Sequence, residues 1–514
     1  MVWAGSVDFR AMLHSGERSV PRRSTVPPER ALALPTLCAA GLAGLALYEP
    51  VQQDSRLFWS ILGSAAAVAA WAITLLVSAR RQHRPFTLEV VPRAQHYVQA
   101  CAHTAIFLYW GWYWPPVYEY AYLIVAQLLF AYAFDMLLGW SRREIYTLGF
   151  GPFPIILSTN LFLWFKQDWF YLQFLMVAVG FAAKELIRWN KDGRQTHIFN
   201  PSSFSLTVFS VALLATGMTG ITRGQDIAIT QFYPPHMYLF LFLVALPGQI
   251  LFGVTTMTMS AVVTTYVFGL AYYGITGTYY FYDSYIPIAV FLGMHLLFTD
   301  PSTAPRTELG RMIFGALYGL STIVLYDILA RAGLPTFYDK LLQVPLMNLS
   351  IRRIDRVVRS GWLRRFDPAA IARSLAPRRR NLAYVSLWAV VFAAISAAQG
   401  VGDRHRGQWI PFWQQACGDD RPRACAYLAQ LHATGCRAGS EWSCNELGIL
   451  QDTRQDDRRG AASRPPADEL PLLLRGSKGP ITDMSPAALH ARACAVGWSM
   501  YCETAVPRDK IGEP

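Results

Sequence analysis

Long apolar stretches recur between residues 31 and 399 of this 514-residue chain, and they constrain its fold more than any other feature. A helix needs roughly 20 apolar residues to cross a bilayer core of about 30 Å. Because backbone polar groups find no water there, stretches of this kind cross as helices. Hydrophobic residues make up 53% of the chain, and the mean hydropathy is +0.24. The sequence therefore predicts an all-α, polytopic membrane helix bundle.

Twelve or thirteen spans are predicted, because one or two of the apolar stretches are short. They lie near residues 31–49, 57–78, 98–114, 120–139, 151–165, 169–187, 201–217, 237–252, 261–276, 284–298, 311–329, 336–350 and 382–399. Basic residues follow every second early span, at 80–84, 142–143 and 184–194. By the positive-inside rule these loops are expected in the cytoplasm. Residues 247–260, with a Pro-Gly pair and several hydroxyls, are expected to form a broken or re-entrant helix.

An arginine-rich arm is expected at residues 351–381. Between residues 352 and 380 ten arginines stand against Asp355 and Asp367, a net charge of +8 within a chain of net +12. Beside a membrane span, such a run predicts a cytoplasmic segment that contacts lipid headgroups. The other features of a nucleic-acid module are missing, so we expect the lipid bilayer as partner and no nucleic acid.

The C-terminal region contains six of the eight cysteines, in three pairs with seven residues between the members of each. On one continuous helix the paired α-carbons would lie about 12 Å apart, beyond disulfide reach, so a bridge requires the chain to turn back as in a helical hairpin. The even count and repeated spacing favour an oxidising compartment over a zinc or haem site. The predicted bridges are Cys417–Cys425, Cys436–Cys444 and Cys494–Cys502.

Two short motifs, residues 197–204 (HIFNPSSF) and 295–303 (HLLFTDPST), each place a small polar residue before proline and two hydroxyls after it. This pattern is typical of a helix start. Helix N-termini favour anionic or carbonyl-rich ligands. We expect both motifs to belong to two pseudo-symmetric repeats and to meet, with Pro201 close to Pro301. The predicted cofactor-binding residues are Asn200, Ser202, Ser203, Thr299, Asp300, Ser302 and Thr303. Alternatively, the hydroxyls only cap their helices.

Ionisable residues within the predicted spans are further candidates for function. His103 and His295 are expected to hydrogen-bond between helices, with a haem clamp as the alternative. Asp135 and Asp327, near span ends, are expected to face the bundle or the headgroups. No nucleophile–base constellation and no metal-ligand spacing stands out, so the sequence suggests no catalytic residue and no metal site.

The first motif, and the spacing of residues 298–305 (FTDPSTAP), resemble the NqrB/RnfD family of membrane subunits from sodium-pumping quinone reductases and Rnf electron-transport complexes. The resemblance covers residues 97–350 and continues through 333–337 (GLPTF) and 346–348 (LMN). It implies an inverted-repeat bundle that carries a flavin near the membrane.

One departure from the family bears on the flavin. Members that attach FMN covalently use a threonine in a Ser-Gly-Ala-Thr-like motif, which is missing here. Residues 253–258 (GVTTMT) are loosely similar to this motif, but their position argues against attachment at Thr258. The chain looks like the divergent UnbU-type branch. Its residues 416–429 and 436–448 look like cysteine-rich Sel-type helical repeats related to TPR units, which usually dock a partner.

These observations together predict the domain organisation and the function. The predicted domains are a cytoplasmic tail (1–30), two transmembrane helices with a basic turn (31–96), the family-like core (97–350), the arginine-rich arm (351–381), a last span (382–400) and extracytoplasmic repeats (401–514). The expected function is a membrane subunit of a redox or ion-coupled electron-transport system in a bacterial inner membrane, with non-covalent FMN or riboflavin. The alternative is a cofactor-free transporter or scaffold. Expected partners are other membrane subunits or an extracytoplasmic protein.

Overall fold

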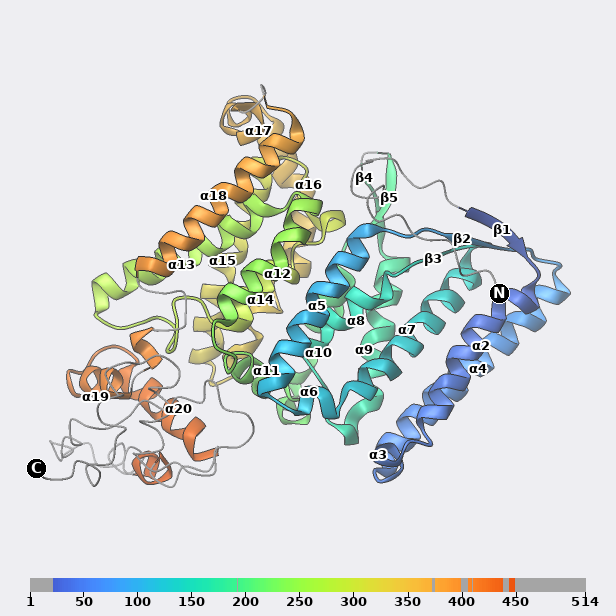
Figure 1. Ribbon diagram of the computed structural model, residues 1–514, viewed down its shortest axis with the longest axis horizontal. Helices are drawn as coiled ribbons and strands as arrows, with labels where there is room; N and C mark the ends of the chain where they lie inside the picture. The colour runs from blue at the N-terminus through green and yellow to red at the C-terminus, as the bar shows by residue number, and fades with distance from the viewer. Residues whose placement is uncertain are drawn as a thin grey trace, which may run out of the picture.

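A computed structural model describes residues 22–191, 193–371, 375–398, 405–408, 410–437 and 443–448 of the chain. Most of these residues lie in helices that form an elongated bundle (Figure 1). The helices are α2 (Pro28–Leu45), α3 (Glu49–Gln52), α4 (Ser55–Arg81), α5 (Ala94–Tyr113), α6 (Pro116–Glu119), α7 (Ala121–Arg142), α8 (Pro152–Asn160), α9 (Phe170–Leu186), α10 (Pro201–Thr216), α11 (Gly224–Thr230), α12 (Met237–Phe252), α13 (Thr255–Thr276), α14 (Ile288–Leu296), α15 (Glu308–Arg331), α16 (Val344–Arg359), α17 (Pro368–Ile371), α18 (Pro377–Ala398), α19 (Ile410–Gly418) and α20 (Ala424–Arg437).

Within the described residues, six helical segments are long and apolar enough to cross a membrane. They are α4, α7, Gln167–Leu186 (which contains α9), α13, α15 and the part of α18 from Arg379. The apolar helices α10 and α12 are shorter. The segment of α18 is only 17% buried and that of α4 33%, so both leave apolar side chains for lipid. The architecture is that of a multi-pass membrane protein.

Three predicted spans are wrong as full crossings. The stretches near 151–165 and 284–298 contain only α8 and α14, nine residues each, and a helix of that length is about 14 Å long. The stretch 336–350 holds a 3₁₀ turn (Thr336–Lys340) and the start of α16. The expected total of 12 or 13 spans is therefore not supported. Apolar composition does not distinguish a short helix buried among neighbours from a helix that crosses lipid.

Helix boundaries elsewhere follow local sequence. Asp54 starts α4 by accepting hydrogen bonds from the backbone N–H groups of Arg56 and Leu57. The break expected within 247–260 lies after Pro247, at Gly253, which has a left-handed backbone and separates α12 from α13. Helices α2, α4, α7 and α9 share one hydrophobic core, and α5, α10 and α12 to α16 share a second.

The described residues also contain short strands, which the all-α prediction did not include. Strand β2 (Phe86–Val90) pairs antiparallel with β1 (Arg22–Val26) and parallel with β3 (Ile145–Leu148). Strands β4 (Arg188–Lys191) and β5 (Arg194–His197) form a hairpin. The predicted loose tail, residues 1–30, therefore ends in a paired strand and the start of α2; its residues 1–21 lie outside the described part.

All five strands lie at one end of the bundle, together with α17 (Figure 1). We call this the basic end, because residues 80–84, 142–143, 184–194 and the arginine-rich arm are all there. Their common end is the arrangement expected of segments on one side of a membrane, and their cytoplasmic location stays a prediction. Helices α3, α6, α11, α19 and α20 lie at the opposite, distal end (Figure 1).

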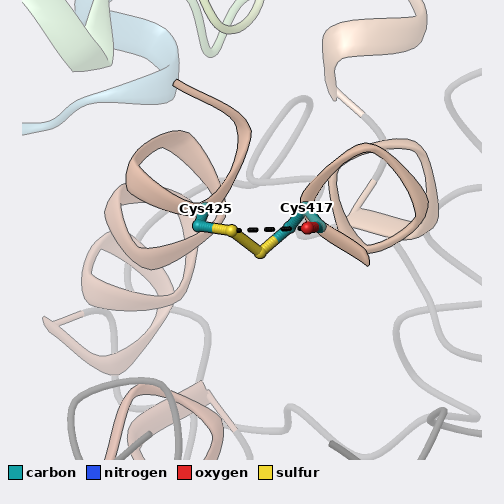
Figure 2. The surroundings of a disulfide bond; sticks show 2 residues. All are labelled: Cys417 and Cys425. Carbon is teal, nitrogen blue, oxygen red and sulfur yellow. Dashed lines mark hydrogen bonds between the residues drawn. A yellow bond between two sulfur atoms is a disulfide. The ribbon is translucent and has the colours of Figure 1, made fainter. Parts of the chain in front are cut away.

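The first two predicted disulfides are present, and the first closes the helical hairpin of α19 and α20, as the spacing required. Cys417 near the end of α19 is bonded to Cys425 at the start of α20, with α-carbons 4.7 Å apart (Figure 2). Cys436 is bonded to Cys444, with α-carbons 4.6 Å apart. The predicted Cys494–Cys502 bridge lies outside the described residues.

Helices α19 and α20, which we call the cysteine hairpin, contact the distal end of the membrane bundle. Arg423 forms an ion pair with Asp327 of α15, and the hydroxyl of Tyr427 donates to the carbonyl of Tyr280. Asp327 therefore faces the hairpin, whereas the sequence placed it toward the bundle or the headgroups.

Candidate functional site

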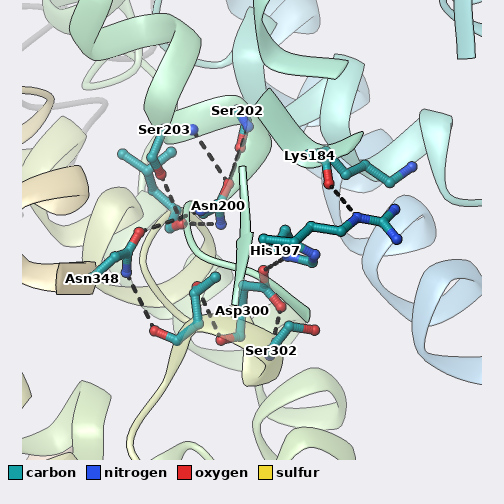
Figure 3. Close-up of polar contacts among 11 residues, drawn as sticks. Lys184, His197, Asn200, Ser202, Ser203, Asp300, Ser302 and Asn348 are labelled. Atoms are coloured by element: carbon teal, nitrogen blue, oxygen red, sulfur yellow. Dashed lines mark hydrogen bonds and ion pairs between the residues drawn. The ribbon is translucent and has the colours of Figure 1, made fainter. Parts of the chain in front are cut away.

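The two proline motifs meet at the basic end of the bundle (Figure 3). Asn200 caps α10, its side-chain oxygen accepting from the backbone N–H groups of Ser202 and Ser203. Its side-chain amide donates to the Leu297 carbonyl of the second motif at 3.0 Å. The hydroxyl of Ser203 donates to the same carbonyl at 3.4 Å. One side chain thus starts a helix and joins the two motifs.

A second contact joins the motifs through the side chains of His197 and Asp300. The Nε2 atom of His197 lies 3.1 Å from an Asp300 carboxylate oxygen. Asp300 also accepts from the backbone N–H of Ser302 at 2.8 Å. Burial raises the pKa of Asp300, but the hydrogen bonds from His197 and Ser302 outweigh it, and the net pKa is lowered. Asp300 is therefore a carboxylate at neutral pH.

The second motif does not open an α-helix as predicted. Asp300 caps only a three-residue 3₁₀ turn, Pro301–Thr303. Ala304 then adopts an extended conformation, which the following Pro305 favours because its ring disfavours helical geometry in the preceding residue. Helix α15 begins at Glu308, capped by Thr307.

Asn348 of α16 bridges both motifs. Its side-chain oxygen accepts from the backbone N–H of Asn200, and its amide donates to the carbonyl of Thr303, each at 3.3 Å. Asn348 is fully buried. In the sequence it stood out only within the LMN segment of the family resemblance, because no local pattern marks a residue that reaches two distant turns.

Close packing of α9 against α10 sets the position of the first motif. Gly180 of α9 faces the first turn of α10, where a Cβ atom would lie 2.9 Å from the Pro201 carbonyl oxygen. Strand β5, which ends at His197, leads directly into the motif. The hairpin and α9 therefore hold the α10 N-terminus at the basic end.

A cavity of about 320 Å³ opens beside this junction. Its charged or titratable lining residues are Arg93, His96, Asp135, Arg143, Tyr146, Lys184, Glu185, Arg188, His197 and Asp300. The N-terminal residues of two helices also line it: Gly151 and Pro152 of α8, and Asn200, Pro201 and Ser202 of α10. Helix N-termini carry partial positive charge, so the wall suits an anionic ligand. The first N–H groups of α10 already donate to Asn200, so this helix contributes through its dipole.

The carboxylates of the cavity wall are paired with its cations. Lys184 lies 3.4 Å from Asp135, and Arg143 and Arg188 each lie 2.6 Å from Glu185. The third carboxylate, Asp300, is bonded to His197. Arg93 is the fourth cation, so the wall contains four cations and three carboxylates. Asp135 faces the bundle interior, as expected.

Two buried polar atoms on the wall have no hydrogen-bond partner among the described residues, namely the Ser158 hydroxyl and Nδ1 of His96. Buried polar atoms of native proteins are nearly always satisfied by protein, water or ligand. Together with the cations and the helix N-termini, these unpartnered polar atoms make the wall suited to an anionic ligand.

The predicted cofactor-binding residues divide into three groups. Asn200, Ser202, Asp300 and Ser302 line the cavity. Thr299 and Thr303 instead bond back to the carbonyls of residues 295 and 300, the capping role kept as the alternative. Ser203 serves the junction. Thr258 is fully buried and does not line the cavity.

Sequence reasoning missed the cavity residues outside the motifs, above all Arg93, His96 and Ser158. They carry no motif, and the basic segment 184–194 served only to assign topology. The expected interhelical bonds of the two histidines are also wrong. Nδ1 of His295 lies 2.7 Å from Phe291 O within α14, and His103 has no hydrogen-bond partner among the described residues.

No protein-family model, curated protein or solved structure matches this chain.

Proposed function

We propose that the chain is the membrane subunit of an electron-transport system, and that its basic-end cavity binds a non-covalent flavin through the flavin phosphate. The observation that carries the proposal is the convergence of two helix N-termini and four cations on a cavity of about 320 Å³. Ligand cavities for small molecules typically measure roughly 300–1,000 Å³. The flavin is inferred from the family resemblance, and the preference for an anionic ligand is inferred from the residues of the cavity wall.

The wall chemistry favours FMN over riboflavin, because riboflavin has no phosphate to meet the cations. Arg93 and the Ser158 hydroxyl would hold the phosphate beside the N-terminus of α10, and the contacts of Asn200 and Asn348 would keep the two motifs in place around it. A bound flavin would supply electron transfer, while these residues bind it, orient it and limit access of water.

The decisive measurement is acid extraction of the purified protein followed by chromatography of the supernatant. FMN should appear in the supernatant, and the denatured band should show no flavin fluorescence, because the Ser-Gly-Ala-Thr-like attachment motif is missing from the sequence. A protein that releases no flavin and shows no binding when titrated with FMN would overturn the proposal.

Arg93→Gln tests the cavity itself. A hydrogen bond to a charged group contributes about 1.5–3 kcal/mol, so FMN affinity should fall about tenfold or more. Arg223→Gln is the matched control. Arg223 lies at the distal end, where it donates to the Tyr120 hydroxyl at 3.2 Å, and its loss should leave FMN affinity unchanged.

A cofactor-free scaffold is the second candidate, supported by the cysteine hairpin held at the distal end away from the cavity. Such repeats present a helical surface to a partner. In that case the purified chain carries no flavin and co-purifies with a partner only while the hairpin disulfides are intact.

A further inference from the structure

A second, smaller cavity lies between α5, α12 and α14, with a volume of about 10 Å³. Its polar lining side chains are Gln99, Gln249, His295 and Thr299. The other residues that line it have apolar side chains or, at Gly248, none. Gln99 also lines the large basic-end cavity. The two cavities are therefore neighbours, with the half-buried Gln99 side chain on the wall of both.

The small cavity is lined by polar atoms that lack partners. Gln249 is 1% exposed, and neither its amide nitrogen nor its amide oxygen bonds to any described residue. His295 is 2% exposed, and its Nε2 atom is likewise unpartnered within the described part of the chain. An unsatisfied buried polar group costs about 1–3 kcal/mol. Two such side chains on one small cavity indicate a bound group that satisfies both.

The chemistry of the two side chains identifies that group. Nδ1 of His295 faces the Phe291 carbonyl oxygen at 2.7 Å, so Nδ1 carries the hydrogen, and Nε2 of the neutral ring is an acceptor. Gln249 offers both a donor and an acceptor. A water molecule, with two donors and two acceptors, complements this set. A water needs roughly 10–15 Å³ and two to four polar partners, and the small cavity provides both.

We propose that the small cavity is a water-binding site that joins Gln249 to His295 and exchanges with the basic-end cavity past Gln99. The site extends water from the basic end into the core of the bundle, as far as the buried α14. Through this site the buried imidazole of His295 contacts solvent water. The inference stands whether or not the large cavity binds flavin.

Radiolytic hydroxyl-radical footprinting of the whole purified protein tests the site, because buried side chains are oxidised where a bound water is activated beside them. His295 should be modified at least fivefold faster than Phe314, each rate being corrected for intrinsic reactivity. Phe314 is fully buried and does not line the small cavity. Equal corrected rates for His295 and Phe314 would overturn the proposal, and this result needs no variant.

Gln249→Leu removes both polar atoms of one partner. Modification of His295 should fall to the Phe314 level, while that of His96 in the basic-end cavity should stay unchanged. Gln127→Leu is the matched control: Gln127 is a buried glutamine whose amide exchanges hydrogen bonds with Asn160 at 2.8 and 3.0 Å. Undiminished modification of His295 in folded Gln249→Leu would contradict the site.

Gln99→Leu tests the connection between the cavities. After rapid mixing with ¹⁸O-labelled water, label should appear in the oxidised His295 product at least tenfold more slowly in this variant than in the unaltered protein. Label that arrives at the same rate in both would show that water reaches the site by another route, and would overturn the proposed exchange past Gln99.

Discussion

Replacing Asn200 with alanine removes two kinds of interaction at once. The side-chain oxygen no longer accepts from the backbone N–H groups of Ser202 and Ser203, and the amide no longer donates to the carbonyl of Leu297. The backbone bond from Asn200 to Asn348 remains. The substitution therefore tests whether the junction of the motifs stabilises the fold.

The expected loss is about 2–3 kcal/mol. Removing a helix cap costs about 1 kcal/mol. Losing the buried bond to Leu297 costs about 1–1.5 kcal/mol, and this carbonyl keeps only the 3.4 Å contact from the Ser203 hydroxyl. Asn200→Ser is the matched variant, because serine caps a helix about as well as asparagine but is too short to reach Leu297. It should lose only about 1–1.5 kcal/mol.

Reversible unfolding in mixed micelles of increasing dodecyl sulfate content, followed by tryptophan fluorescence, measures the free energy of unfolding. Asp54→Ala provides a second reference, since Asp54 caps α4 through Arg56 and Leu57 in the same way. It should cost about 1 kcal/mol. Equal losses for Asn200→Ala and Asn200→Ser would refute the assigned cap, and losses below about 0.5 kcal/mol for both would refute a stabilising junction.

Two further predictions concern the distal end. Burial lowers the pKa of His405 to about 3, and its ring packs 4.0 Å from that of Tyr279. Its unfolded pKa is near 6.5, so its contribution to the stability of the docked hairpin should be complete above pH 6.5 and fall by up to about 1.4 kcal/mol per pH unit below it. Burial also lowers the pKa of His432 in α20 to about 4, so His432 should add a similar loss. Limited proteolysis across pH 7 to 5 should show the decline, and His405→Phe should make it shallower. If the distal end is extracytoplasmic, Cys417 and Cys425 in intact cells should react with a membrane-impermeant maleimide only after reduction. Labelling that needs permeabilisation but no reductant would indicate the opposite orientation and the absence of the bridge.

Local features of the sequence were sufficient for much of the fold. Apolar length predicted the long helices, because a helix in lipid satisfies its own backbone bonds. Basic residues predicted a common end, and the spacing of Cys417 and Cys425 predicted a hairpin, because covalent reach allows no straight helix between them. The cap at Asn200 was likewise visible, since capping depends on the next three residues alone.

The cavities between these elements could be found only from the tertiary structure. The large cavity takes Arg93, Ser158 and Lys184 from three separate segments, and none of them stands in a recognisable pattern. Asn348 bonds to two turns that lie far from it in sequence. The nine-residue lengths of α8 and α14 depend on neighbours that bury them, and Gln249 and His295 share a cavity only because α12 packs against α14. Contacts between residues distant in sequence produce no periodic pattern along the chain. The sequence alone therefore predicted the helices and their common basic end. The candidate site was determined by how the helices pack.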